Sequence, residues 1–385
     1  MTDDWRHGGF GLYIHWPFCE AKCPYCDFNS HVARAIDQRA WRDAYLKEIR
    51  RVAAETPRRV LNSVFIGGGT PSLMAPETVA DVIGAIRRAW PLANDLEITL
   101  EANPGSVEAG RFAAFREAGV NRISMGIQSL DDGDLKRLGR VHDVAEALAA
   151  FDIARRQFDR VNFDLIYGRQ DQGVAAWRAE LKQALSLAID HVSLYQMTIE
   201  SGTAFGDRYA RGGLRGLPDE DLAAALYEVT QEMCDAAGMP AYEVSNHARE
   251  GAQSRHNLIY WRYGDYLGIG PGAHGRLTVG GGRWATVCES NPAKWLGLVD
   301  RGMAEKPRET LSGAEQATEF LLMGLRLKEG VSLSRYETIA GVPLEQGRLD
   351  HLSEIGMIEV SGDRLIVSDQ GFMVMNAVIE ALLPD

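Results

Sequence analysis

The chain has 385 residues, of which 45% are hydrophobic and 24% charged, an ordinary balance for a globular protein with one large and one small domain. Its net charge of −12 argues against a general nucleic-acid surface. No apolar run approaches the length of a membrane span, and the acidic start MTDDWRHGG is not a secretory signal. We therefore expect a cytoplasmic protein with reduced thiols, and its five cysteines are a poor basis for a disulfide framework.

Six short strand-like runs, each followed by a helix-like run, fill the first 245 residues. The predicted strands are residues 11–16, 63–68, 96–102, 122–128, 161–168 and 191–197. The predicted helices are residues 38–55, 76–89, 107–118, 143–157, 174–188 and 219–237. This alternation predicts an α/β fold with a parallel sheet and right-handed crossovers. It leaves two architectures open, a doubly wound sheet and an incomplete barrel.

The pattern changes after about residue 245. Residues 246–308 form an extension that is rich in Gly, Tyr and Trp over 251–290, and we expect loops and short strands that pack on the first domain, residues 1–245. Residues 309–385 predict helices, a strand pair with a Gly-Asp turn and a last helix, which together indicate a small winged-helix-like α+β domain. That region holds 13 acidic and 5 basic side chains, so we do not expect it to bind DNA.

Three of the five cysteines lie in the stretch GLYIHWPFCEAKCPYCDF, residues 11–28. Cys19, Cys23 and Cys26 have the spacing C-x3-C-x2-C just after the first predicted strand, at the edge where barrel-like folds carry their chemistry. Three thiolates at this spacing can hold one metal centre. An iron–sulfur cluster with four irons would keep one iron open, whereas structural zinc needs a fourth ligand, for which His15 and His31 are the neighbours. Three ordinary thiols are the remaining alternative.

Polar and glycine residues recur where the other predicted strands end. The run Gly67-Gly68-Gly69-Thr70-Pro71 follows the second strand and permits close approach of a ligand, although a tight turn would also explain it. Solvated strand ends are the alternative for any single polar residue, but four at one edge exceed what a solvated rim needs. These four residues are Glu101, Gln128, Asp164 and Gln196, and Arg140 follows in the next loop and helix. Cys234 and Cys288 are isolated, and we expect both to be structural.

The cysteine spacing, with Tyr25 before the last cysteine, resembles the cluster loop of the radical S-adenosylmethionine (SAM) enzymes. The resemblance implies a partial (βα)6 barrel in which Cys19, Cys23 and Cys26 hold a [4Fe–4S] cluster. It also implies that SAM chelates the open iron and is cleaved to methionine and a 5′-deoxyadenosyl radical. The cofactor-contacting positions that the resemblance implies are Tyr13, Tyr25, Gly68, Gly69, Thr70, Glu101, Gln128, Arg140 and Asp164.

Longer motifs resemble one group within that family, the oxygen-independent coproporphyrinogen III oxidases and related haem chaperones. They are YIHWPFC, FIGGGTPS, MGIQS, DLIYG and RHNLIYWRYGDYLGIGPGAHG, and the likeness extends from about residue 9 to 380. Two departures favour the chaperone branch. Phe28 stands where the oxidases carry a fourth cysteine, and only 18 residues precede Cys19 where they carry a longer extension.

The hexapeptide HNLIYW, residues 256–261, is similar to a haem-associated signature of the chaperone branch, which implies that His256 contacts haem. Taken alone, it equally fits an aromatic-rich core strand with a satisfied histidine. His274 in GPGAHG is a weaker candidate near the barrel mouth. The loop DLIYGRQDQ departs from the usual Gly-Leu-Pro turn of relatives, so Arg169 and Gln170 predict a reshaped loop there.

The resemblance thus implies a carrier that binds the cluster, SAM and haem and passes haem to acceptor proteins, with membrane association only through such a partner. One alternative is an enzyme, an oxidase that decarboxylates two porphyrinogen propionates. The other is a structural zinc protein with a degenerate barrel.

Overall fold

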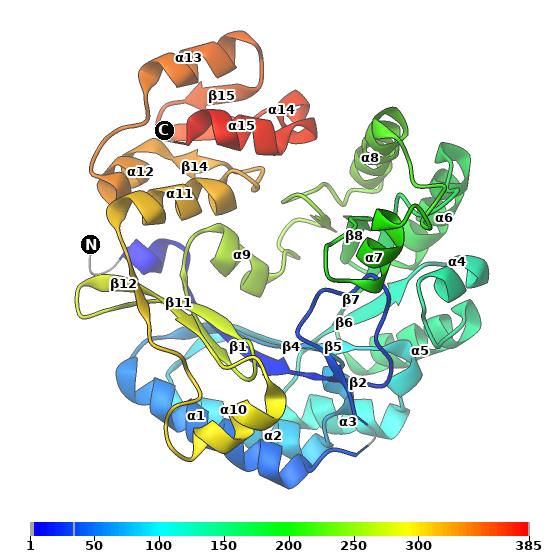
Figure 1. The fold of residues 1–385 in the computed structure, drawn as a ribbon, viewed down its shortest axis with the longest axis vertical. Helices are drawn as coiled ribbons and strands as arrows, with labels where there is room; N and C mark the ends of the chain where they lie inside the picture. Colours follow the sequence, from blue (N-terminus) through cyan, green and yellow to red (C-terminus); the bar gives the residue numbers. More distant parts are fainter. Residues whose placement is uncertain (1–3, 34, 384–385) are drawn as a thin grey trace.

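A computed structural model describes residues 4–33 and 35–383. These residues form an eleven-stranded sheet in the order β13-β12-β11-β10-β1-β4-β5-β6-β7-β8-β9, a three-stranded sheet and a two-stranded sheet. The large sheet curves around an interior, with helices on its outer face and the C-terminal elements above one side (Figure 1). Among the described residues, no helix is both long enough and apolar enough to cross a bilayer.

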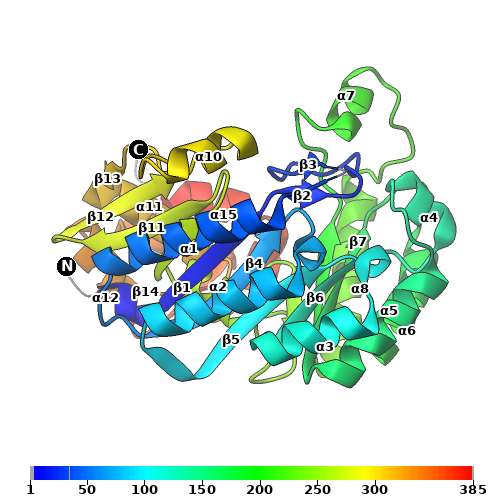
Figure 2. The same ribbon diagram turned by 90° about the horizontal axis from the view of Figure 1, so that it is seen from below.

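The predicted strand–helix units are all present and make a partial (βα)6 barrel. Its parallel strands are β1 (Phe10–Trp16), β4 (Leu61–Gly68), β5 (Leu92–Ala102), β6 (Arg122–Gln128), β7 (Arg160–Tyr167) and β8 (His191–Gln196). The helices that follow them are α1 (Gln38–Glu55), α2 (Pro76–Ala89), α3 (Ala109–Ala118), α5 (Val144–Gln157), α6 (Val174–Leu187) and α8 (Glu220–Ala236). Helices α1, α2 and α3 lie side by side along the outer face of the strands (Figure 2).

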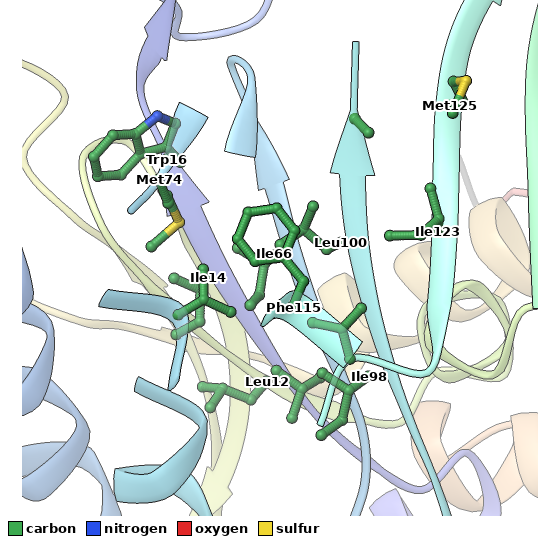
Figure 3. Close-up of a cluster of buried hydrophobic side chains, with 14 of the residues drawn as sticks. Leu12, Ile14, Trp16, Ile66, Met74, Ile98, Leu100, Phe115, Ile123 and Met125 are labelled. Atoms are coloured by element: carbon green, nitrogen blue, oxygen red, sulfur yellow. The ribbon is translucent and has the colours of Figure 1, made fainter. Parts of the chain in front are cut away.

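Each barrel strand carries apolar side chains toward the helices and polar ones toward the interior. Leu12, Ile14 and Trp16 of β1 pack in one core with Ile66 of β4 and Phe115 of α3 (Figure 3). Side chains alternate along a strand, so the intervening residues face the other way, into the interior. Buried polar side chains at those intervening positions include His15, Ser63, Glu97, Thr99, Arg122, Asn162, His191 and Ser193. The barrel interior is therefore polar and its outer layer apolar.

The extension, residues 246–308, is more regular than the sequence suggests. The segment HNLIYW lies on a helix, α9 (Arg255–Trp261), which begins where the Ser254 hydroxyl accepts the backbone N–H of Asn257. Strand β10 (Asp265–Ile269) pairs in parallel with β1, on the side opposite β4. Antiparallel strands β11 (His274–Val279), β12 (Gly282–Val287) and β13 (Glu309–Leu311) continue the sheet beyond β10, and β9 (Asn246–Ala248) ends it beside β8. The extension thus widens the sheet at its β1 side.

The C-terminal region has its own hydrophobic core and the element order of a winged helix. Its elements are α11 (Gly313–Gly324), β14 (Val331–Ser332), α12 (Leu333–Ala340), α13 (Gln346–Glu354), β15 (Ile358–Ser361), β16 (Arg364–Val367), α14 (Asp369–Met373) and α15 (Met375–Leu382). Ion pairs Arg276–Glu319, Arg262–Glu329 and Arg335–Asp4 tie it to the rest. Residue 309, the predicted start of this domain, lies in β13 of the large sheet, and the predicted domain boundaries stay predictions.

The remaining elements are short. They are the 3-10 turns η1 (Asp4–His7), η2 (Pro71–Leu73) and η3 (Pro104–Ser106), strands β2 (Phe18–Cys19) and β3 (His31–Val32), and helices α4 (Asp132–Arg137), α7 (Ala204–Ala210) and α10 (Pro292–Val299).

Candidate functional site

The three clustered cysteines line one cavity of about 140 Å³ at the carboxyl edge of the barrel strands. Of the positions that the sequence singles out, the cavity brings together Cys19, Cys23, Cys26, Tyr25, Gly68, Gly69, Thr70, Glu101, Gln128, Arg140 and Asp164. Tyr13 and His256 lie outside this lining. Residues from five consecutive strand–helix units therefore converge on one space, as the position of the predicted strand ends implies.

The cysteine loop, residues 17–32, contains little regular structure. Its two ends are joined by the pairing of strand β2 with strand β3. Within it, the Cys26 thiol lies 3.8 Å from the Ser30 hydroxyl. The Cys23 sulfur accepts a hydrogen bond from Arg140 Nη1 at 3.4 Å. Burial raises the pKa of the Cys19 and Cys26 thiols, so a positive charge or a metal is needed to favour their thiolates.

The thiols lie along the wall of the cavity and do not converge on a single point. Among residues 4–33 and 35–383, no three His, Cys, Asp or Glu side chains are close enough to hold one metal ion. Zinc binds thiolates at roughly 2.3 Å, so its ligands must converge tightly. A cluster with four irons accepts each thiolate at a separate corner. The donor set and the cavity between the thiols fit such a cluster.

The glycine run packs directly on the start of the cysteine loop. Gly68 has a φ of +115°, and a Cβ there would lie 2.6 Å from the His15 ring. A Cβ on Gly69 would lie 2.5 Å from the Phe18 carbonyl oxygen. The N–H of Thr70 donates to that same oxygen at 2.7 Å. A side chain on Gly68 would therefore collide with β1 and one on Gly69 with the cysteine loop, which explains why glycine occupies both positions.

Two carboxyl groups face the cavity in environments that favour their protonated forms. Burial raises the pKa of Glu101 to about 8, and the nearby charge of Asp164 adds to the shift. Glu101 also accepts the backbone N–H of Gly68 at 3.0 Å. Burial raises the pKa of Asp164 to about 6, against hydrogen bonds from Ser193 and Ser124. Near neutral pH, Glu101 can therefore donate a hydrogen bond while Asp164 is mostly an acceptor.

The sequence predicts Asp164 at a strand end. In the structure it lies in the middle of β7 instead. It reaches the cavity because it is one of the inward-facing positions of that strand, where it pairs in register with Gly126 and Ser193. The polar interior of the barrel and the cavity wall are thus continuous.

Arg140 and Gln128 show the two marks of a site built for a ligand. The buried Nε of Arg140 has no hydrogen-bond partner among the described residues, while its Nη2 donates to the Gly126 carbonyl at 2.7 Å and to Asn103 at 3.1 Å. Gln128 has a φ of +77° next to a register shift that follows Gly126 in β6. Unpaired buried donors and positive φ at a residue other than glycine both occur preferentially at binding sites.

A larger cavity of about 1040 Å³ adjoins the first and extends to the C-terminal domain. The two share the lining residues Tyr25, Cys26, Phe28, Glu101, Gln128 and Asp164. Its walls carry exposed apolar side chains from both sides, with Phe28 at 59%, Met373 at 45% and Val374 at 48% exposed. Arg326 and Asn376 line the C-terminal wall, and Arg326 donates to the Asn376 side-chain oxygen at 3.2 Å.

Tyr13 and His256 lie deeper in the barrel than the cavity. The Tyr13 hydroxyl donates to His15 Nδ1 at 2.9 Å. His256 is buried, with Nδ1 2.8 Å from the Ser63 hydroxyl and Nε2 2.7 Å from the Tyr260 hydroxyl. Burial lowers the pKa of His256 to about 3, so its ring is neutral. Both ring nitrogens are occupied within the chain, and the contact of His256 with haem stays a prediction.

Several residues near the site were not predicted from the sequence. Asn103 and Ser124 line the small cavity. The signal for Ser124 is the period-2 placement of polar residues on β6, and Asn103 follows directly after β5. Helix α7 lies beside β2 and β3 (Figure 2), where the N–H of Phe205 donates to the Pro24 carbonyl at 2.8 Å. No motif marked this cover of the cysteine loop.

The residues that departed from the family pattern, or that looked isolated, have structural positions. Arg169 is buried and forms ion pairs with Asp134 and Glu180, and it lines neither cavity. Cys234 and Cys288 are buried, at 0% and 2% exposed. Gln196 lines the large cavity, and its side chain donates to the Ala223 carbonyl at 3.1 Å.

Comparison with known proteins identifies the family of the chain. Residues 13–176 match the model of the radical SAM superfamily, and residues 311–374 match that of the HemN C-terminal domain. The chain is 40% identical to the mitochondrial radical S-adenosyl methionine domain-containing protein 1 of Bos taurus, over 97% of this chain and 87% of that protein. It is 37% identical to the heme chaperone HemW of Escherichia coli, over 97% and 98% of the two chains.

Among solved structures, coproporphyrinogen III oxidase (HemN) from Escherichia coli superposes with a TM-score of 0.80, covering 98% of this chain and 92% of that one. The two sequences are 21% identical, so this likeness concerns the fold.

Proposed function

The chain belongs to the radical SAM family, in the HemN-like group that includes HemW, and on that premise we propose that it is a haem chaperone that binds a [4Fe–4S] cluster, SAM and haem. It would deliver haem to acceptor proteins. The similarity to HemW over nearly the whole chain supports this proposal.

The observation that carries the proposal is the large cavity beside the cysteines. Its volume of about 1040 Å³ is at the upper end of the range for small-molecule sites, which is roughly 300 to 1,000 Å³. Apolar side chains from the barrel mouth and from the C-terminal domain face each other across it. A large planar ring with apolar faces and a few charged groups at its edge suits such a space.

For the cofactors, we propose that Cys19, Cys23 and Cys26 hold the cluster and that SAM extends from the small cavity into the adjoining part of the large one, past their shared residues Glu101, Gln128 and Asp164. When bound, the cluster supplies an open iron and an electron to the cofactor beside it. The chain's own groups orient that cofactor. Arg140 suits a carboxylate, and Glu101 and Asp164 suit hydroxyl or amino groups.

For haem, we propose that Arg326 pairs with a propionate at the C-terminal wall of the large cavity. Among the described residues that line this cavity, Arg326 is the only arginine or lysine. Burial lowers its pKa. Guanidinium and carboxylate groups form strong, geometrically specific pairs, and a partly buried guanidinium gains more from such a pair than an exposed one.

The affinity for haem tests this placement. Arg326→Ala should weaken haem binding roughly tenfold in an absorbance titration, because one charge-assisted hydrogen bond is lost. Arg364→Ala is the matched control, since Arg364 lies on β16 and lines neither cavity. Equal affinities for the two variants would place haem elsewhere and leave His256 as the next candidate.

The oxidase is the alternative function, because the HemN-like group also includes coproporphyrinogen III oxidase. The protein reconstituted anaerobically with iron and sulfide, with its cluster confirmed, would be given coproporphyrinogen III, SAM and a strong reductant. We expect no porphyrin product. Formation of protoporphyrinogen with matching consumption of SAM would overturn the chaperone proposal.

A further inference from the structure

Asn29 lies three residues after Cys26 and joins the end of the cysteine loop to the extension. Its side-chain nitrogen donates to the carbonyl oxygens of Pro271 at 2.9 Å and of Ser290 at 2.8 Å. Its side-chain oxygen lies 3.1 Å from His31 Nε2. The backbone carbonyl of Asn29 accepts a hydrogen bond from His15 Nε2 at 3.0 Å. One residue thus connects the loop, strand β1 and two segments more than 240 positions away.

The turn Gly270-Pro271-Gly272 is shaped to receive this side chain. A Cβ on Gly272 would lie 2.7 Å from the side-chain nitrogen of Asn29, and a Cβ on Gly270 would lie 2.4 Å from the His15 carbonyl oxygen. The turn is itself fixed, because the N–H of Gly272 donates to the Glu289 carbonyl at 3.0 Å. The glycines of the GIGPGAHG motif therefore allow the turn to approach the cysteine loop closely.

The two ends of the cysteine loop are held by different parts of the molecule. The Cys19 end is held by the glycine run, through the N–H groups of Gly69 and Thr70. Near the Cys26 end, Asn29 supplies the attachment through its side chain, and Ser30, the next residue, lies beside the Cys26 thiol. Three ligands of one group must be held at fixed separations, so both ends need to be fixed.

We propose that Asn29 is a positioning residue for Cys26, through its hydrogen bond to the Gly270–Gly272 turn, and that the GIGPGAHG motif holds the cysteine loop in place. This inference goes beyond the ligand sites and rests on the proposed function only in taking the loop as the cluster site. It assigns a role to a motif whose own candidate ligand, His274, is exposed and lines neither cavity.

The test compares Asn29→Ala and Asn29→Asp with Asn121→Ala. Aspartate keeps the size of the side chain but has no N–H to donate to the two carbonyl groups. Asn121 is the matched control, because its side chain also bridges backbone groups, the N–H of Ile98 at 2.8 Å and the carbonyl of Leu96 at 2.7 Å. It is not among the residues that line the cysteine cavity.

Two measurements are made on each protein. The first is the rate of Cys26 alkylation by iodoacetamide in the apoprotein, followed by mass spectrometry, which needs no cluster. The second is the iron and sulfide retained after anaerobic reconstitution and a timed exposure to air.

Both Asn29 variants should raise the Cys26 alkylation rate roughly tenfold, as expected for the loss of two hydrogen bonds. Asn121→Ala should leave the rate unchanged, and only the Asn29 variants should lose their iron faster. An unchanged Cys26 rate in the Asn29 variants would overturn the inference. So would an equal increase in Asn121→Ala, which would indicate general loosening. If the wild-type protein takes up no iron, the cluster proposal fails while the alkylation rates still decide the role of Asn29.

Discussion

The cysteine loop and helix α9 are the two segments that the sequence marks most strongly, and they use their side chains in opposite ways. The three thiols of the loop line a cavity and have few partners within the chain. His256 and Tyr260 of α9 are packed inside the barrel and hydrogen bonded to each other. A sequence motif shows that particular residue types are needed at a place. The bonds already made within the chain show whether a ligand or the fold needs them.

The largest expected effect is at the three thiols, which have few partners within the chain. Replacing Cys19, Cys23 or Cys26 with Ala should abolish uptake of a full cluster, because each thiol is a proposed ligand and nearby side chains offer no substitute thiol. Iron, sulfide and zinc contents and the absorbance spectrum measure this. Cys234→Ala, in a buried position apart from the cavity, should load normally. Zinc in place of iron and sulfide in the wild-type protein would favour the structural zinc alternative.

The next largest effect concerns the buried carboxyl group of Glu101. Between its ordinary pKa of 4.5 and its value of about 8 in the fold, the folded protein holds a proton that the unfolded chain has lost. The free energy of unfolding should therefore fall as pH rises through this window, by up to ~1.4 kcal/mol per pH unit. Asp164 acts in the same direction, but only up to a pH of about 6.

Denaturant titrations from pH 6.5 to 8 isolate the Glu101 contribution. Glu101→Gln should flatten the slope, because the amide does not titrate. Glu200→Gln, at an exposed carboxyl group on the rim of the large cavity, should keep it. A slope that survives in Glu101→Gln would mean that another group holds the proton.

A substitution of His256 tests the other half of the comparison, the side chains that are already hydrogen bonded within the chain. His256→Ala should lower the free energy of unfolding by about 2 to 4 kcal/mol, because it leaves a cavity and unpaired partners in Ser63 and Tyr260. Cluster loading should remain normal at temperatures well below the unfolding transition. Ser63→Ala is the matched control, since it removes a partner of His256 and leaves the ring. Loss of haem affinity in His256→Ala alone would support the direct haem contact that the sequence predicts.

The smallest effect is at Gln128, where the backbone itself is strained. Gln128→Gly should be more stable than Gln128→Ala by about 1 kcal/mol, because glycine adopts a φ of +77° without a steric penalty and alanine does not. Both variants lack the side chain that lines the cavity, so their difference does not include its contacts. Equal unfolding free energies would show that the bulge in β6 relaxes when the side chain is removed.

Local periodicity was sufficient to predict the strand–helix units, whereas the choice of a barrel over a doubly wound sheet came from the family resemblance. The predicted strands and helices agree with the structure to within a few residues. Each strand alternates apolar and polar residues, and each helix repeats its apolar residues, over enough positions to be recognised without its neighbours. The pairing of β10 with β1 was not predictable in this way, since the two strands are more than 240 residues apart and β10 is only five residues long. Helix α9 had one local signal, the N-cap residue Ser254, in a segment that otherwise reads as loop.

The candidate site was predicted in part for the same reason. Parallel strands bring their carboxyl ends to one edge, so Glu101 and Gln128 could be placed from strand order alone. Asp164 needed the inward and outward alternation of β7. The far wall of the large cavity, residues 372–377, comes from another domain, and neither spacing nor periodicity indicates that it faces the barrel mouth.

The charge of the large cavity has a consequence for what it can distinguish. Its described lining includes the four acidic side chains Asp27, Asp164, Glu200 and Glu220, with Arg326 as the positive one. Glu101 also lines it, but burial raises its pKa to about 8, so it is mostly uncharged near neutral pH. A porphyrin that lacks its metal carries two negative propionates and nothing to offset them, so this wall repels it. A ferric centre adds one net positive charge to the ring. The cavity should therefore discriminate in favour of the iron-loaded ring, and occupancy by its metal-free counterpart should be disfavoured without any steric difference between the two.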